Sequence, residues 1–258
     1  MTARPLEDCG ILVVGGTAGI GYASARAIAM AGARRVVLVG RDGNRGEEAR
    51  TRLAAETGAE VGFLRGDATR AEEATRIASE AERLLGGVDV LVCSTVAEAI
   101  PTLFHDIPTD GIERIVREML MPPMQIVSAA LPGMRDRKGG SVILVASDAG
   151  KTATPGETII GACKAAIIMF ARTVAMEAKR DGVRVNVMTP SLVHGTASTE
   201  RITTDGFSAR LFARAAEQAS LGVPDADDLG ALAAFLAGPA SAKLTGQAIS
   251  VNGGISAA

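Results

Sequence analysis

The sequence has few aromatic residues and almost no net charge. Its 258 residues include no Trp and a single Tyr, Tyr22, and aromatic residues make up 3% of the chain. The core must therefore be built from aliphatic side chains and Met. Lys and Arg together number 27 and Asp and Glu 29, which gives a formal net charge of -2. That balance gives no reason to expect a nucleic acid or an anionic membrane as a partner.

Cysteines and long apolar runs at the N-terminus are also scarce. Cys9, Cys93 and Cys163 are odd in number and scattered. This pattern fits reduced thiols better than a disulfide framework or a zinc site. The first apolar run, residues 11–16, is too short for a signal peptide or a membrane span and ends in Gly-Gly. We therefore expect a soluble, cytoplasmic protein with no metal site and no membrane partner.

Short apolar segments alternate with longer amphipathic segments along the chain. Strand patterns occupy residues 11–16, 35–40, 88–94, 140–147, 183–190 and 247–254, and a further strand ends near Asp67. Helical patterns lie between them, including residues 159–180 and a stretch from 110 to about 132, which Pro122 and Pro123 should kink. Such alternation requires crossover connections and hence a parallel sheet with helices on both faces. With no linker or repeat, residues 1–258 are predicted to form a single doubly wound, Rossmann-type α/β domain with a seven-stranded sheet.

The segment VVGGTAGIG, residues 13–21, places Gly15, Gly19 and Gly21 between the first strand and the first helix. Glycines allow a sharp turn and a close approach to phosphates, while the helix N-terminus faces their negative charge. Glycines also make tight turns for packing alone. The position after the first strand and at the start of the first helix favours a dinucleotide site.

The end of the second strand bears on the choice between NAD and NADP. An acidic residue there binds the ribose 2′-hydroxyl, whereas an arginine accommodates a 2′-phosphate. This chain has Gly40 followed by Arg41, with Arg45 nearby. Asp42 either repels a phosphate or caps the next helix, and Arg41 is alternatively a solvated surface charge. The pattern favours NADP and leaves NAD open.

These motifs resemble the short-chain dehydrogenase/reductase family from about residue 9 to residue 254. The glycine spacing, GDAT at 66–69, GSVILVASDAG at 140–150, VRVNVMTP at 183–190 and LTGQAISVNGG at 244–254 carry the resemblance. It implies an NAD(P)-binding oxidoreductase that assembles as a dimer or tetramer, and we expect a homotetramer. The residues implied to bind the cofactor are Gly15, Thr17, Gly19, Ile20, Gly21, Arg41, Asp67, Ala68, Lys164, Pro190 and Thr196.

The family's catalytic tetrad of Asn, Ser, Tyr and Lys is only half present. Ser147 and Lys164 match its serine and lysine, but Met119 falls near the asparagine position and Ile160 stands where the tyrosine is expected. Ile160 lies thirteen residues after the serine and four before the lysine, as the family's tyrosine does. The chain departs from the family pattern at further positions. Val14 replaces the Thr that usually opens the glycine motif, and CSTV at 93–96 stands where Asn-Asn-Ala-Gly is expected. Ser191 replaces a Gly, and Thr196 lies one place beyond the usual threonine.

The tyrosine of the family exchanges a proton with the substrate oxygen while the serine hydrogen-bonds it. General acid catalysis is typically worth ~10²–10⁴-fold, so its loss requires another proton route. Lys164 either anchors the ribose or acts as the acid. His194, in the loop after the sixth strand, either exchanges the proton or is simply solvated. Glu157 and Asp148 flank the site and either cap helices or face solvent.

Met119, Met121 and Met124, together with Ile160, either form an apolar substrate pocket or belong to the core or a subunit interface. The leading hypothesis is an NADP-dependent oxidoreductase acting on a small, fairly apolar carbonyl or alcohol through an altered proton relay, with Ser147, Lys164 and His194 as catalytic candidates. One alternative is a lyase, isomerase or dehydratase on the same scaffold. The other is a degenerate dinucleotide-binding subunit.

Overall fold

The computed structural model describes residues 4–204 and 206–257. Seven parallel strands form one sheet in the order β3-β2-β1-β4-β5-β6-β7. They are β1 (Gly10–Val14), β2 (Arg35–Gly40), β3 (Glu60–Arg65), β4 (Val90–Cys93), β5 (Gly140–Val145), β6 (Val183–Met188) and β7 (Ala248–Ile249). The direction of winding reverses between β1 and β4, which is where open α/β sheets bind their ligands. The predicted doubly wound, seven-stranded fold is confirmed.

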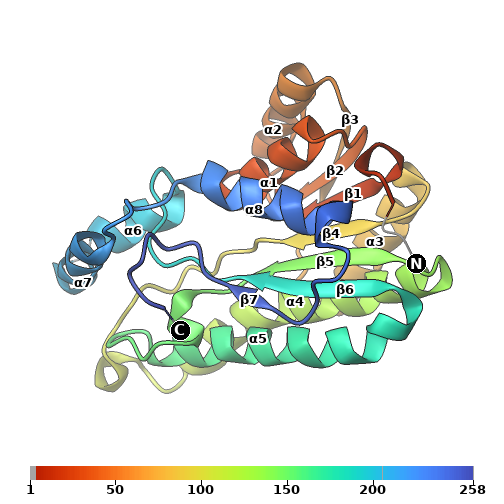
Figure 1. Cartoon of the computed structure of the whole chain (residues 1–258). Helices are drawn as coiled ribbons and strands as arrows, with labels where there is room; N and C mark the ends of the chain where they lie inside the picture. Colours follow the sequence, from red (N-terminus) through yellow and green to blue (C-terminus); the bar gives the residue numbers. More distant parts are fainter. Residues whose placement is uncertain (1–3, 205, 258) are drawn as a thin grey trace.

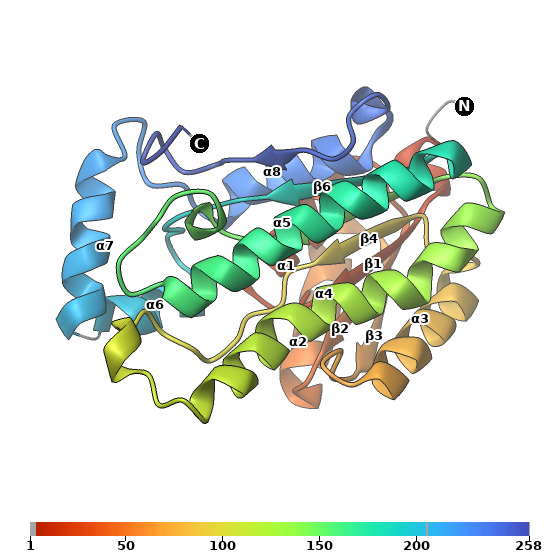
Figure 2. The same ribbon diagram turned by 90° about the horizontal axis from the view of Figure 1, so that it is seen from below.

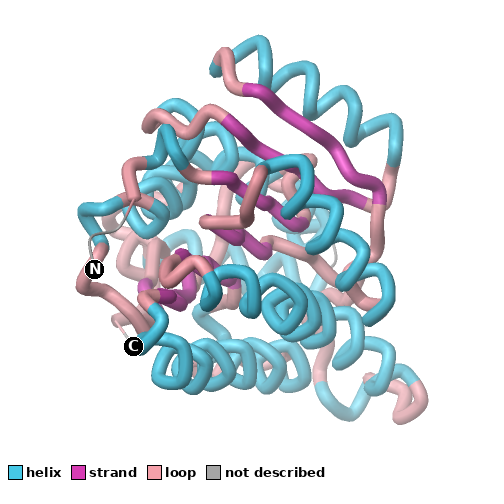
Figure 3. The backbone as a smooth tube through the Cα atoms, turned by 90° about the vertical axis from the view of Figure 1, so that its right-hand side faces the viewer, coloured by secondary structure: helices cyan, strands magenta, loops and turns pink. Residues whose placement is uncertain are grey.

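Helices cover both faces of the sheet (Figures 1 and 3). One face carries α1 (Gly19–Met30), α2 (Gly43–Thr57) and α8 (Ala226–Ala237), and the other carries α3 (Ala71–Leu85), α4 (Gly111–Asp136) and α5 (Thr158–Ala178). Two further helices, α6 (Ala197–Thr204) and α7 (Gly206–Gln218), project at one end of the molecule in Figure 1. The single sheet thus separates two aliphatic cores.

The two cores follow from strand periodicity. Successive side chains point to opposite faces, so Leu12 and Val14 join the core under α3, α4 and α5, whereas Val13 joins the core under α1 and α8. Ile143 and Leu144 of β5 divide in the same way, and both are fully buried. Strands buried on both faces read as the continuous apolar runs found in the sequence.

Several predicted boundaries were wrong by a few residues. The first strand ends at Val14, because Gly15 takes a φ of 78° and begins the turn. The last strand is only Ala248–Ile249, which pair with Val187 and Met188 before the chain leaves the sheet. The long helix is assigned without a break through Pro122 and Pro123 and continues to Asp136. Met134, fully buried in its last turns, holds that end of α4 against the core.

Helix α5 is unusually apolar. Among the described residues, Thr158–Asp181 is the one helical stretch long and apolar enough to cross a membrane. It lies along the sheet beside α4 instead, as Figure 2 shows, and buries Cys163, Ile167 and Ala171 in the cores. Its apolarity is that of a core helix whose opposite side leaves Met169 and Met176 exposed.

Arg184, a buried charge in β6, holds the end of α8. Its guanidinium donates to the Leu236 carbonyl at 2.8 Å and to the Ser241 hydroxyl at 2.9 Å, and burial lowers the pKa of Arg184. The last carbonyls of a helix lack partners within it, and the Leu236 carbonyl accepts from Arg184 together with the hydroxyls of Ser141 and Ser241.

Replacing Arg184 by Met should lower the free energy of unfolding by about 2–3 kcal/mol, because the buried Leu236 carbonyl and the Ser241 hydroxyl each lose a hydrogen bond from a charged donor. Urea unfolding monitored by circular dichroism measures the loss. The control is Arg180→Met, which removes an exposed arginine nearby and should change the free energy by less than about 0.5 kcal/mol. Equal losses for the two variants would contradict the helix-capping role.

Candidate functional site

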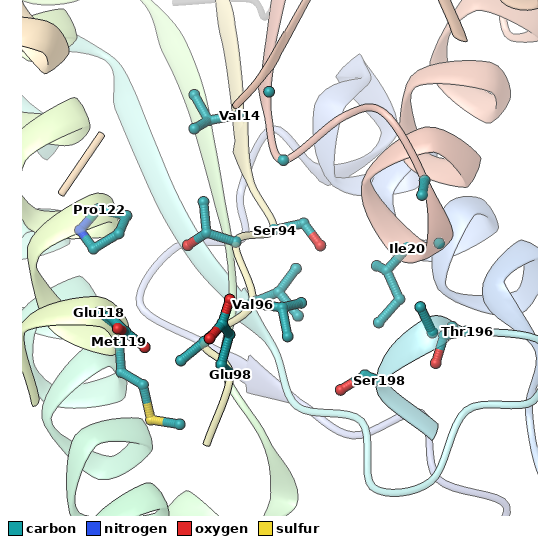
Figure 4. Close-up of a pocket in the computed structure, with 18 of the residues that line it drawn as sticks. Val14, Ile20, Ser94, Val96, Glu98, Glu118, Met119, Pro122, Thr196 and Ser198 are labelled. Carbon is teal, nitrogen blue, oxygen red and sulfur yellow. The ribbon is translucent and has the colours of Figure 1, made fainter. Parts of the chain in front are cut away.

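A cavity of about 1020 Å³ opens at the carboxyl ends of the strands, across the point where the winding reverses. Val14 pairs with both Val39 and Cys93, so the residues that follow β1, β2 and β4 meet at this edge. Figure 4 shows part of the lining, with Ser94 and Val96 between the α4 side, marked by Met119, and the α1 side, marked by Ile20. The position is the usual one for a ligand on this fold.

Three glycines shape the turn between β1 and α1. Gly15 and Gly19 have φ angles of 78° and 51°, in the left-handed region that favours glycine. A Cβ on Gly15 would lie 2.4 Å from the Ser94 carbonyl oxygen, and one on Gly21 would lie 2.1 Å from the Gly15 carbonyl oxygen. The turn is therefore packed against both β4 and its own helix. This leaves the N-terminus of α1 open to the cavity, which Gly15, Thr17, Gly19 and Ile20 line.

Arginines gather where β2 and β3 end. Arg41, Arg45 and Arg65 all line the cavity, and Arg65 Nε donates to the Arg41 carbonyl at 3.1 Å. Asp42 accepts a hydrogen bond from the Arg45 backbone N–H at 3.1 Å and so caps α2. Arg65 was missed in the sequence, although the parallel register pairs it with Gly40.

Asp67 and Ala68 follow β3 and also line the cavity. The Asp67 carboxylate accepts from the backbone N–H and the hydroxyl of Thr69, at 3.0 and 2.8 Å. These bonds hold the side chain in one orientation at the cavity wall.

Ser147 follows β5 and reaches the cavity from the opposite side of the reversal point. Its hydroxyl accepts from the Ala149 N–H at 3.3 Å, so it caps its own turn while still lining the cavity. Two glycines let this turn press against α5. A Cβ on Gly150 would lie 2.7 Å from the Lys164 carbonyl carbon, and one on Gly161 would lie 2.8 Å from the Ala149 carbonyl oxygen.

The first turns of α5 present Glu157, Ile160 and Lys164 to the same cavity. Spacings of three and four residues place these side chains on one face of a helix. Burial lowers the pKa of Lys164, against the opposing influence of Cys93, Cys163 and Glu157. The aliphatic Ile160 lies between Glu157 and Lys164 along that face in the sequence.

Glu157 is the functional candidate whose importance the sequence understated. It occupies the N-cap position of α5, but its side chain makes no capping hydrogen bond. Burial raises the pKa of Glu157 to about 7, with Asp148 adding to the rise and Lys164 opposing it. Asp148, by contrast, is buried away from the cavity and accepts from the Ser256 hydroxyl at 2.6 Å. Of the two flanking carboxyls, only Glu157 faces the cavity.

The loop after β6 contributes Pro190 and Thr196 to the lining but not His194. Thr196 immediately precedes α6, and a Cβ on Gly19 would lie 3.6 Å from its methyl group. His194 is exposed and pairs through its backbone with Pro224 and Asp225. That pairing turns the histidine outward, so the structure does not bring this predicted proton donor to Ser147 and Lys164. Gly21 is likewise outside the lining and acts through its contact with the turn.

The substrate side of the cavity is less apolar than predicted. Met119 and Ile160 line it with Phe212, but Met121 and Met124 do not. The lining also contains Glu98, Glu118 and Arg201, and Figure 4 shows Glu118 next to Met119 and Glu98 next to Val96. A helix presents one residue in about four to a given side, so neighbouring methionines of α4 face elsewhere. Glu98 and Glu118 belong to no recognisable motif, so the sequence alone could not assign them to the site.

The residues present fit a nicotinamide dinucleotide. Cβ atoms at Gly15 or Gly21 would force the turn to move, so these positions offer only backbone atoms near the N-terminus of α1. A helix N-terminus of this kind is where a pyrophosphate would be held. The arginines lie at one end of the cavity and Ser147 and Lys164 at the other. The fold and this cavity define a dinucleotide-binding α/β protein.

Comparison with known proteins identifies the class more closely. The family model described as Enoyl-(Acyl carrier protein) reductase matches residues 15–256. D-beta-hydroxybutyrate dehydrogenase from Cupriavidus necator is 30% identical over 253 residues, covering 94% of this chain and 96% of the relative. The chain therefore belongs to the short-chain dehydrogenase/reductase family and is an NAD(P)-dependent oxidoreductase of that type.

Solved structures agree. A short-chain type dehydrogenase/reductase from Mycobacterium ulcerans superposes with a TM-score of 0.89 at 25% identity, covering 99% of this chain and 91% of its own. An NADPH-bound short-chain oxidoreductase from Pseudomonas aeruginosa PAO1, described as containing an atypical catalytic center, gives a TM-score of 0.86 at 26% identity and covers 98% of each chain.

Proposed function

We propose that this protein is an NADP-dependent oxidoreductase that interconverts a small carbonyl compound and its alcohol through an altered proton route. The observation that carries the proposal is the cavity itself, in which the glycine turn, Ser147 and Lys164 converge while Ile160 faces them. Ile160 takes the place of the family's tyrosine, since its spacing to both Ser147 and Lys164 is that of the family. The scaffold for hydride transfer is retained and its usual acid is replaced.

The bound nicotinamide would supply or accept the hydride. Ser147 would hydrogen-bond the substrate oxygen from the turn after β5, which α5 holds in position. Lys164, whose pKa is lowered by burial, would bind the ribose hydroxyls, and its protonated form would make the local potential positive. Ile160 and Met119 would exclude water from the reacting carbon.

The hydride-transfer proposal is tested by calorimetry with NADPH and NADH, followed by NADPH oxidation with phenanthrenequinone, an activated diketone that needs few specific contacts. We expect binding of NADPH and slow, measurable turnover. Absence of binding for both nucleotides would refute the proposal. Binding without any turnover would refute hydride transfer and favour the degenerate-subunit alternative.

Arg41 supports the choice of NADP. With Arg45 and Arg65 it surrounds the end of β2, and Asp42 is engaged in capping α2. Replacing Arg41 by Ala should weaken NADPH binding about 10–100-fold, the value of one charge-assisted hydrogen bond, and NADH binding less than about threefold. Calorimetry on both nucleotides measures the ratio.

The matched control is Arg50→Ala, an arginine on α2 that pairs with Glu47 outside the cavity. It should leave both affinities unchanged. Equal weakening of NADPH and NADH by Arg41→Ala would contradict the proposed phosphate contact.

We propose that the protein assembles as a dimer or a tetramer with α4 and α5 in the interface. Of the two, we expect the homotetramer. Helix α5 leaves Met169 and Met176 exposed, at 59% and 61% of their surface, on the side turned away from the sheet. Burying that side against a second copy would remove apolar surface from water.

A further inference from the structure

We propose that Glu157 is the proton donor and acceptor of this active site and performs the task left open by Ile160. This inference rests on the proposed hydride-transfer function. It names a residue that neither the family's tetrad nor the glycine motif contains, and it follows from where the start of α5 lies in the cavity.

Glu157 lies at the start of α5, at the wall of the cavity. Glu157 lies three residues before Ile160 and seven before Lys164, so the three side chains follow one face of α5 along the cavity wall. Ser147 reaches the same cavity from the turn that packs against α5 at Gly150 and Gly161. A substrate oxygen held by Ser147 would therefore lie near the first turn of α5, where Glu157 supplies a carboxyl group.

The Glu157 carboxyl is also unused by the fold. Asp42 and Asp225 occupy N-cap positions and accept hydrogen bonds from their helices, whereas the side chain of Glu157 does not. The first turn of α5 is made instead by the Glu157 carbonyl, which accepts from the Gly161 N–H at 2.5 Å. Replacing the carboxyl should therefore leave the helix intact.

Neighbouring segments pack against the residue before Glu157, which is itself half-buried. Gly156 has a φ of 84°, and a Cβ there would lie 2.6 Å from the Phe207 ring. The Gly156 carbonyl accepts from the Thr102 N–H at 2.7 Å. Segments from α7 and from the loop after β4 thus close over the residue next to Glu157.

The charged surroundings tune the carboxyl. Burial is the main cause that raises the pKa of Glu157 to about 7, with Lys164 acting to lower the pKa and Asp148 to raise it. Glu98, Glu118 and Arg201 are the other charged groups that line the substrate side. A pKa close to the operating pH is the best compromise between donating and accepting a proton.

During reduction, a bound NADPH would supply a hydride to the carbonyl carbon and become NADP+, while the C=O π bond breaks and the oxygen gains a proton as the O–H bond of Glu157 breaks. The Glu157 carboxylate then takes a proton from water. Oxidation of the alcohol runs in reverse, with the Glu157 carboxylate accepting the hydroxyl proton.

Glu157→Gln tests the inference because it keeps the size and polarity of the side chain and removes its acidity. We expect kcat/KM for phenanthrenequinone reduction by NADPH to fall about 10²-fold. In the wild-type protein this parameter should be level below pH 7 and fall above it, since the protonated carboxyl is the active form. The variant should lose that inflection and bind NADPH normally by calorimetry.

A second readout needs no turnover. Infrared difference spectra of the nucleotide-free protein, wild type minus Glu157→Gln, should show a protonated carboxyl that titrates near pH 7 and not near the ordinary value of 4.5. Glu177→Gln, on the exposed side of the same helix, is the control and should change neither activity nor its pH dependence.

An active wild type whose activity and pH profile survive Glu157→Gln would overturn the inference while leaving the oxidoreductase function standing. A carboxyl titrating near pH 4.5 would also overturn it. Failure of the wild type to bind NADPH or turn over would refute the proposed function, and the inference with it.

Discussion

Introducing tyrosine at position 160 in a chain that already carries Glu157→Gln is expected to raise kcat/KM for phenanthrenequinone about 10²-fold over Glu157→Gln alone. Ile160 lines a cavity of about 1020 Å³, so the larger ring has room to extend toward Ser147. Lys164 lies one helical turn further along, and its positive charge lowers the pKa of a phenol placed there. The rate of NADPH oxidation, measured at saturating NADPH with varied phenanthrenequinone, gives the change in kcat/KM.

The same Ile160→Tyr change in the wild-type chain should raise the rate less than about tenfold, because Glu157 already provides an acid and two acids cannot both protonate one oxygen. The two substitutions are therefore expected to be strongly non-additive, as groups sharing one task are. Ile160→Phe, which adds the ring without the hydroxyl, is the control and should not rescue Glu157→Gln. Rescue by Phe would show that packing, and not proton transfer, was restored.

Much of the fold could be predicted because parallel strands leave a direct signature. Each strand buried on both faces gives an uninterrupted aliphatic run, and each crossover helix follows at a regular distance. The errors occurred where chain ends and helix ends depend on tertiary contacts. Helix α4 passes beyond Pro132 because Met134 is buried in the core, and no local rule contains that information.

The residues of the candidate site likewise fall into those that the sequence could place and those that it could not. The sequence could place the glycine turn, Arg41, Ser147 and Lys164 at one cavity because their positions relative to strand ends are fixed by topology. The sequence could not show that His194 lies outside the cavity lining, because its backbone pairs with the segment before α8, a contact between parts of the chain distant in sequence.

Glu157 was visible in the sequence, but the packing of Phe207 and of the loop after β4 against its neighbour Gly156 was not. A carboxyl acquires an altered pKa from its surroundings and not from its neighbours along the chain. The same holds for the acidic substrate side, where Glu98 and Glu118 come from separate loops and helices. The sequence thus identifies the groups held by regular elements better than those whose chemistry depends on enclosure.

Replacing Gly21 by Ala is expected to weaken NADPH binding at least about 10²-fold, because the new Cβ would lie 2.1 Å from the Gly15 carbonyl oxygen and 3.2 Å from the Gly16 Cα. Real contacts are longer, so α1 and the turn must separate, and the N–H groups at the helix N-terminus move away from the phosphates. Overpacking of this kind also costs about 1–3 kcal/mol of stability. Calorimetry and urea unfolding separate the two effects.

Gly111→Ala is the matched control for that experiment. Gly111 begins α4, has no heavy atom within 4 Å of the position its Cβ would take, and is not required to adopt a positive φ. It should bind NADPH like the wild type and be as stable or slightly more so, since alanine favours a helix over glycine by about 1 kcal/mol. If Gly21→Ala bound NADPH as tightly as Gly111→Ala, the close contact between the turn and α1 would not position the dinucleotide, and the phosphates would have to be held by the arginines at the end of β2.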